Sequence, residues 1–137
     1  MSGAAFTTFV EGPPVPKGRP RVTRNGHAYT PARTVAWEET VAWNTRNAMD
    51  GRAPFQGPLQ VELTFYGGRA NADLDNLCKA VLDAMNKVVY EDDKQIVTLI
   101  ARRGGSEKST YLLHYGKGVD ISVWPALVPE QHKKRGA

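Results

Sequence analysis

A strict alternation of apolar and polar residues between Leu59 and Tyr66 constrains the fold of this chain most strongly. Side chains two positions apart lie on the same face of a β-strand, so an alternating segment has one apolar and one polar face. The apolar positions are Leu59, Val61, Leu63 and Phe65, and the polar positions are Gln60, Glu62, Thr64 and Tyr66. The segment therefore predicts a half-buried strand within a sheet.

Other segments predict the elements that surround this strand. Apolar residues at helical spacing indicate two helices, over about 35–49 and 76–88, with Thr34 as the expected N-cap of the first. Three further β-type runs complete the set, at residues 6–10, 95–102 and 119–124, and the last is expected to pair with residues 111–115.

The order of these elements is strand, loop, helix, strand, helix, strand, strand, which is typical of the α+β (mixed α/β) class. With 137 residues the chain is about one domain long. We therefore expect a single domain over residues 1–124, built from a small mixed sheet and two main helices. Residues 125–137 are expected to form a flexible basic tail.

Composition excludes two classes of protein. The single cysteine, Cys78, excludes an internal disulfide and a multi-cysteine zinc site, and it suits a reducing compartment. No apolar run approaches the roughly 18–20 residues of a membrane-spanning helix, and residues 1–10 lack the pattern of a signal peptide. We therefore expect a cytoplasmic protein with no membrane partner.

A proline-rich segment over residues 12–33 predicts a long loop. Prolines interrupt any helix or central strand in this segment, and long loops inside a compact domain are usually functional or disordered. Basic residues alternate with glycine and proline here, so their side chains are expected to point outward and to contact phosphates. The expected DNA-binding residues are Lys17, Arg19, Arg21 and Arg24.

Charge is distributed unevenly along the chain. Residues 1–36 carry a net charge of +4, residues 62–93 carry −4, and residues 94–137 carry +5. Basic flanks favour a polyanionic partner such as nucleic acid, because each neutralised phosphate releases a counterion. An acidic centre suits such a protein if its carboxylates hold a divalent cation against the phosphate. A solvated surface with chance clustering of charge is the alternative interpretation.

The acidic centre contains Asp73, Asp75, the Asp92-Asp93 pair and, one turn into the second helix, Lys79. Asp73 and Asp75 lie two residues apart, so in extended backbone both reach one side and could hold one Mg²⁺. The Asp92-Asp93 pair would join them if the 95–102 strand started where the 59–66 strand ends, which antiparallel pairing would achieve. Lys79 could then stabilise charge on the phosphate.

Each of these residues also has a structural interpretation. Asp73 or Asp75 could cap the second helix, and Lys79 could pair with Asp75 or Asp83 at the i,i+4 spacing. The Asp92-Asp93 pair could belong to a turn. Each feature alone favours the structural interpretation, whereas their combination within 21 residues favours a metal-dependent site.

The combined pattern resembles the RusA family of Holliday junction resolvases, small endonucleases of bacteria and their prophages. The resemblance covers roughly residues 8–101, and the block that starts at Asp73 together with the later Asp-Asp block is its most specific part. The matching segments are Gly12-Pro-Pro-Val-Pro-Lys-Gly-Arg-Pro-Arg21, Tyr29-Thr-Pro31, Asp73-Leu-Asp-Asn-Leu-Cys-Lys-Ala-Val-Leu-Asp-Ala-Met85 and Val89-Tyr-Glu-Asp-Asp-Lys-Gln-Ile96.

The resemblance implies an α/β homodimer that resolves four-way DNA junctions with Mg²⁺, for which Mn²⁺ can substitute, in recombination and repair. It implies that Asp73, Asp75 and Asp93 are the metal-binding catalytic residues, with Asp92 as the alternative third ligand. Lys79 matches the essential lysine of the family. The alternatives are a nuclease that acts on other branched DNA, such as flaps or forks, and a non-catalytic DNA-binding protein.

Overall fold

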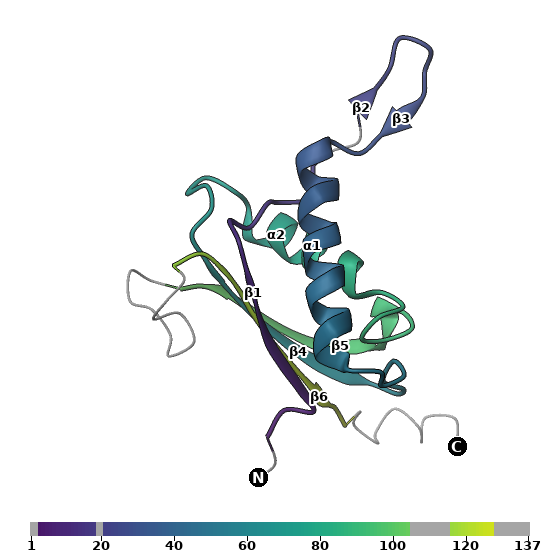
Figure 1. Ribbon diagram of the computed structural model, residues 1–137, viewed down its shortest axis with the longest axis vertical. Coiled ribbons are helices and arrows are strands. Elements are labelled where there is room, and N and C mark those ends of the chain that lie inside the picture. The colour runs from purple at the N-terminus through teal and green to yellow at the C-terminus, as the bar shows by residue number, and fades with distance from the viewer. Residues whose placement is uncertain (1–2, 19–20, 105–115, 128–137) are drawn as a thin grey trace, which may run out of the picture.

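A mixed four-stranded sheet forms the centre of the fold in the computed structural model, which describes residues 3–18, 21–104 and 116–127 (Figure 1). The strand order is β1-β6-β4-β5, in which β1 pairs with β6 and β6 with β4 in antiparallel fashion. The predicted α+β class is confirmed. The strands are β1 (Phe6–Glu11), β4 (Leu59–Tyr66), β5 (Ile96–Arg103) and β6 (Gly118–Pro125).

The core lies between one face of this sheet and two helices, α1 (Ala32–Met49) and α2 (Leu74–Met85), which also contact each other. The alternation in β4 works as predicted, because all four of its apolar side chains are buried and the polar ones are half-exposed. Strand β6 supplies a second buried row of side chains, namely Val119, Ile121 and Val123.

The first helix begins earlier than the sequence indicates, and the prediction of Thr34 as its N-cap is wrong. Pro31 precedes the helix, and the fixed φ angle of proline suits a helix start. Thr34 instead lies buried inside α1, where its hydroxyl accepts a hydrogen bond from the Gly18 amide and donates one to the Pro16 carbonyl. The helix start is therefore joined to the segment that precedes it.

Strands β4 and β5 are parallel, so the antiparallel pairing that would bring the Asp92-Asp93 pair to Asp73 and Asp75 does not occur. Ile96 at the start of β5 lies beside Leu59 at the start of β4, and Arg103 lies beside Phe65. The connection between them contains all of α2, and a crossover helix is what joins two neighbouring parallel strands. The segment before β5 therefore lies at the opposite end of the sheet from the segment after β4.

The expected loop over residues 12–33 contains a short hairpin made of β2 (Arg21–Val22) and β3 (Ala28–Tyr29). Residues 21–29, named here the β2–β3 arm, are all exposed, and Figure 1 shows the arm projecting beyond the start of α1. The turn is closed by hydrogen bonds between Thr23 and His27, and Gly26 supplies the positive φ that it needs.

Two sequence predictions fall outside the described residues. The expected pairing partner of the last strand, 111–115, is one of them, and most of the expected tail, 128–137, is the other. Within the described residues β6 pairs with β1 and β4. None of the helices in the described ranges combines the length and the hydropathy needed to cross a membrane.

Truncation of the core should lower stability strongly. Leu63 is fully buried in β4, so Leu63→Ala is expected to lower the free energy of unfolding by about 2–5 kcal/mol, measured by urea denaturation. Leu127→Ala is the matched control, because the Leu127 side chain is 95% exposed and its removal should change the free energy of unfolding little. An equal decrease in the free energy of unfolding for both variants would contradict the placement of Leu63 in the core.

Candidate active site

Two of the predicted site residues lie together where α2 begins. Asp73 is the N-cap residue, in extended backbone, and Asp75 lies in the first turn. The side-chain amide of Asn76 donates to Asp73 Oδ2 at 3.5 Å, and the Asn76 backbone amide donates to Asp75 Oδ1 at 2.9 Å. Both carboxylates are exposed, and no cation among the described residues forms an ion pair with either. They are therefore free to bind a ligand.

The position of Asp73 agrees with the capping interpretation, but its side chain makes no capping hydrogen bond. The pair instead offers the chemistry that Mg²⁺ prefers, since Mg²⁺ is usually held by one or two carboxylates together with waters and substrate phosphates. No group of three acidic, histidine or cysteine side chains that could hold a metal ion occurs in the described parts of the chain. Within one chain, the residues therefore fit a metal site with two carboxylate ligands, Asp73 and Asp75.

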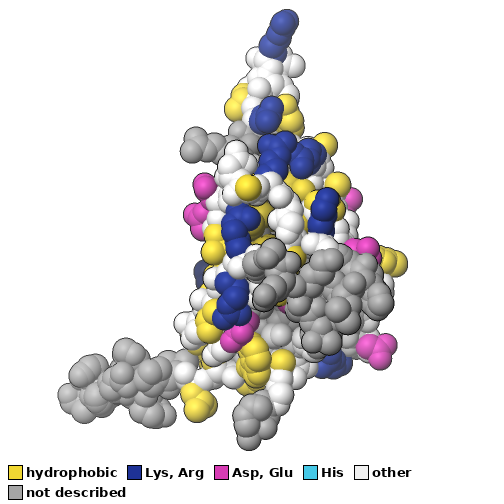
Figure 2. Space-filling view, turned by 90° about the vertical axis from the view of Figure 1, so that its left-hand side faces the viewer, with side chains coloured by type: hydrophobic (Ala, Val, Ile, Leu, Met, Phe, Trp, Pro, Cys, Tyr) yellow, Lys and Arg dark blue, Asp and Glu magenta, His cyan; other side chains and the backbone are white. Residues whose placement is uncertain are grey.

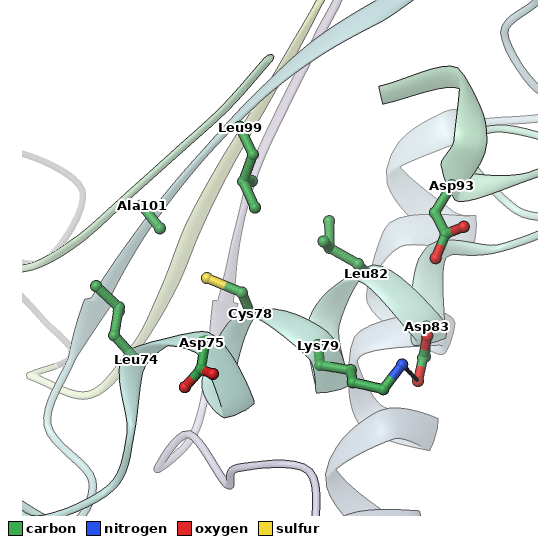
Figure 3. Close-up of a pocket in the computed structure, with 9 residues that line it drawn as sticks. All are labelled: Leu74, Asp75, Cys78, Lys79, Leu82, Asp83, Asp93, Leu99 and Ala101. Atoms are coloured by element: carbon green, nitrogen blue, oxygen red, sulfur yellow. Dashed lines mark ion pairs between the residues drawn. The ribbon is translucent and has the colours of Figure 1, made fainter. Parts of the chain in front are cut away.

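Lys79 lies one turn further along α2 and points away from the sheet (Figure 3). Its ammonium is 3.6 Å from the Asp83 carboxylate, and its side chain is 60% exposed. Of the two i,i+4 partners that the sequence offers, the structure pairs Lys79 with Asp83 and not with Asp75. The Lys79 ammonium therefore lies beside Asp83 and away from Asp75, in a surface ion pair that is weak in water.

Lys17 occupies a very different environment from the one that the sequence suggests. Its ammonium lies 2.7 Å from Glu38 on α1 and 3.1 Å from Asp83 on α2, and its side chain is only 25% exposed. Burial alone would lower the pKa of Lys17, but its hydrogen bonds to the two carboxylates outweigh that effect and raise it. The Lys17 backbone amide also donates to the Asn76 carbonyl at 2.8 Å. Lys17 thus joins the segment before the β2–β3 arm to both helices.

Sequence reasoning did not identify this cluster. Asp83 was visible only as a helical neighbour of Lys79, four residues along the same helix. Glu38 lies 21 residues from Lys17 in the chain, and no local spacing rule connects them. The contact exists because α1 and α2 pack against each other, which is a property of the tertiary structure.

Asp92 and Asp93 have separate positions, although they are neighbours in the chain. Asp92 is the N-cap of the short helix η1 (Asp93–Gln95), where its carboxylate accepts a hydrogen bond from the Lys94 amide and Gln95 completes a capping box. That backbone hydrogen bond lowers the pKa of Asp92, because it favours the charged carboxylate. Asp93 is half-buried, and it lines a groove.

This groove, of about 670 Å³, lies between α2 and β5 (Figure 3). Asp75 lies toward one end, and Asp93 toward the other, beyond Asp83. Because β4 and β5 are parallel, the expected meeting of Asp93 with Asp73 and Asp75 does not occur within one chain. The apolar residues that line the groove are Leu74, Cys78, Leu82, Leu99 and Ala101.

Cys78 in this groove is a neutral thiol at physiological pH. Burial, together with the negative charge of Asp75, raises its pKa to about 11. Because the thiolate is the form that binds metals and attacks electrophiles, Cys78 serves here as an apolar packing residue.

Two of the expected DNA-binding arginines, Arg21 and Arg24, lie exposed on the β2–β3 arm. Arg19 lies outside the described residues. Figure 2 shows Lys and Arg side chains on the projecting arm and on the same side of the molecule below it. No acidic residue occurs between Gly12 and Trp37, so the arm and its base form a continuous basic segment.

The structural role of Asp92 as the N-cap of η1 can be tested by thermal unfolding. We expect Asp92→Ala to lower the melting temperature, because η1 loses its N-cap, and Asp93→Ala to lower it less. The folded-state pKa of Asp92 lies below its ordinary value of 3.8. The Asp92 carboxylate therefore contributes its full stabilisation above that pH. This stabilisation disappears as the pH falls through the folded-state pKa, so the melting temperatures of the wild type and of Asp92→Ala should converge there. Equal melting temperatures of the wild type and Asp92→Ala at pH 7 would contradict the capping role of Asp92.

Comparison with known proteins places the chain in a family. Its residues 11–113 match the family described as "Endodeoxyribonuclease RusA". The chain is also 28% identical over 133 residues to the "Uncharacterized protein YqaN" of Bacillus subtilis (strain 168), an alignment that covers 79% of this chain and 92% of that protein. The family match spans most of the fold, including α2, β4, β5 and the residues of the groove. The chain therefore belongs to the RusA family, whose members are Holliday-junction-resolving endodeoxyribonucleases.

Proposed function

We propose that this protein is a Mg²⁺-dependent, structure-selective endonuclease that hydrolyses phosphodiesters on two strands of a four-way DNA junction, in DNA recombination and repair. The observation that carries the proposal is the pair of exposed carboxylates, Asp73 and Asp75, which form no ion pair within the described residues and are followed one turn along α2 by the exposed Lys79. Family membership adds the substrate class.

In this proposal Asp73 and Asp75 hold Mg²⁺, or Mn²⁺ in its place, whereas Asp93 lies at the other end of the groove, outside their cluster. A cation bound there would polarise the phosphodiester and favour deprotonation of a water molecule. Lys79 neutralises the negative charge that develops on the phosphate, and its exposure allows it to reach the DNA backbone. Asn76 orients both carboxylates through its two hydrogen bonds, so it is a positioning residue.

The β2–β3 arm holds the DNA in this proposal. Arg21 and Arg24 are fully available for phosphates, and Arg19 belongs to the same basic segment. The ammonium of Lys17 is already committed to Glu38 and Asp83, so we assign Lys17 to holding the base of the arm against both helices. A homodimer suits the substrate, because a four-way junction has approximate two-fold symmetry. The single buried Cys78 suits a reducing cytoplasm.

Loss of one carboxylate should abolish catalysis while sparing DNA binding. We expect Asp75→Asn to lower Mg²⁺-dependent cleavage of a synthetic four-way junction by roughly 100-fold or more, because it removes a metal ligand. Junction affinity measured without divalent cation should stay nearly unchanged. Asp50→Asn is the matched control, since Asp50 is an exposed residue at the far end of α1 and should leave cleavage intact.

The substrate panel for this test contains the junction, a flap, a replication fork and a linear duplex of the same sequence. Paired, symmetric nicks confined to the junction are expected. Preferential cleavage of the flap or fork would show that these structures, and not the four-way junction, are the substrate. Cleavage by Asp75→Asn at the wild-type rate would overturn the assignment of the site. Binding by the wild-type protein without cleavage of any substrate would identify a DNA-binding protein.

The arm should account for part of the salt dependence of DNA binding. Removal of Arg21 and Arg24 together is expected to weaken junction binding and to make the plot of log affinity against log salt shallower by about 1 per lost phosphate contact. Lys17→Met should instead lower the melting temperature and leave the salt slope nearly unchanged, because its charge faces two carboxylates. A shallower salt slope for Lys17→Met alone would show that Lys17 contacts phosphates.

A further inference from the structure

The β2–β3 arm exposes an aromatic side chain beside a basic one. Tyr29 is 49% exposed at the base of the arm, close to the start of α1 (Figure 1). In the antiparallel hairpin Tyr29 lies directly opposite Arg21, so the two side chains share one face of the arm. Val22 and Ala28 form the next pair and occupy the opposite face. One face of the arm therefore combines an exposed aromatic ring with an arginine.

Arg21 also lines a pocket of about 270 Å³ at the base of the arm. Two further arginines line it, Arg33 from the first turn of α1 and Arg69 from the loop after β4. No carboxylate lines the pocket, and none of the three arginines forms an ion pair with another described residue. Three positive charges without a counter-charge repel one another, so the pocket favours an anionic ligand.

The start of α1 adds to this preference. The backbone dipoles give the N-terminus of a helix a partial positive charge, which acidic side chains usually offset. The first turn of α1 contains no acidic residue and instead carries Arg33, and no side chain caps the helix start. An anion bound beside Arg33 would offset this unfavourable placement. Phosphate is the anion that fits best, because arginine binds it through paired hydrogen bonds.

We propose that this surface receives one unpaired nucleotide at the branch point of the DNA, so that Tyr29 stacks on the base while Arg21, Arg33 and Arg69 hold the adjacent phosphate. The inference rests on the proposed function and adds a source of structure selectivity. Stacking on an aromatic side chain requires a base whose face is uncovered. In a linear duplex each base is covered by its neighbours, and separating it from them costs free energy. A branch point interrupts this stacking.

The same contacts connect the nucleotide to the candidate active site. Arg69 lies four residues before Asp73, in the connection between β4 and α2. The base of the arm is packed closely against α1, because the Gly18 amide donates to the Thr34 hydroxyl and a Cβ atom at Gly18 would lie 2.9 Å from the Pro31 ring. A nucleotide held at the arm would therefore help to determine which phosphodiester reaches the acidic pair.

Junction affinity without divalent cation tests the stacking contact. We expect Tyr29→Ala to weaken binding of a four-way junction by about 5- to 150-fold, the range for loss of one base stack, and to leave binding of a linear duplex nearly unchanged. Tyr29→Trp should restore junction binding, because it restores an aromatic face. Val22→Ala is the matched control, since Val22 is 66% exposed on the opposite face and its truncation should change neither affinity. Equal weakening of junction and duplex binding by Tyr29→Ala would overturn the proposal.

Salt dependence separates the base contact from the phosphate contact. Tyr29→Ala removes no charge, so the slope of log affinity against log salt should stay unchanged. Arg33→Gln should make the slope shallower by about 1, as expected for the loss of one phosphate contact. Circular dichroism checks that both variants keep the fold. An unchanged slope for Arg33→Gln would overturn the phosphate half of the proposed site.

Photochemical cross-linking locates the base directly. A junction that carries 5-iodouracil at the branch point is bound to the protein and irradiated, and the linked residue is identified by mass spectrometry. We expect the link at Tyr29, and no link at Tyr29 when 5-iodouracil lies in the middle of a duplex arm of the junction. A bound branch-point probe that links only to other residues would contradict stacking on Tyr29.

A free nucleotide carries the same two groups, so thymidine 5′-monophosphate tests the source of the ligand. A rise in melting temperature with this nucleotide that requires Tyr29, together with unchanged junction affinity of Tyr29→Ala, would identify a free-nucleotide site and overturn the proposal. None of these measurements needs a divalent cation. Absence of junction cleavage by the wild type would therefore refute the proposed nuclease activity alone, while the binding and cross-linking results would still decide the role of Tyr29.

Discussion

The parallel pairing of β4 with β5 determines where every candidate catalytic group lies. Helix α2 crosses from the end of β4 back to the start of β5, so Asp73 and Asp75 follow one end of the sheet and Asp93 precedes the other. The groove between α2 and β5 runs from Asp75 to Asp93 and is lined by apolar side chains together with Lys79 and Asp83. The parallel pairing thus separates the acidic residues within a single chain.

Burial divides the basic residues of the N-terminal segment into two groups. Lys17 is mostly buried between two carboxylates, where breaking the cluster would leave an acidic side chain without its partner, so it stabilises the junction of α1 and α2. Arg21 and Arg24 stand in solvent on a hairpin with only two residue pairs. Such a hairpin is marginally stable alone, and contact with a polyanion would add to its stability.

The sequence alone determined the elements whose signals are local. The alternation over residues 59–66 predicted β4, the helical spacing predicted α2 near its observed bounds, and the motif that begins at Asp73 indicated the family. The tertiary structure decided the direction of β5, the Lys17 contacts with Glu38 and Asp83, and the division between the capping Asp92 and the groove-lining Asp93. These features depend on which distant segments pack together, and the free energy of such packing comes from contacts that no local pattern of residues encodes.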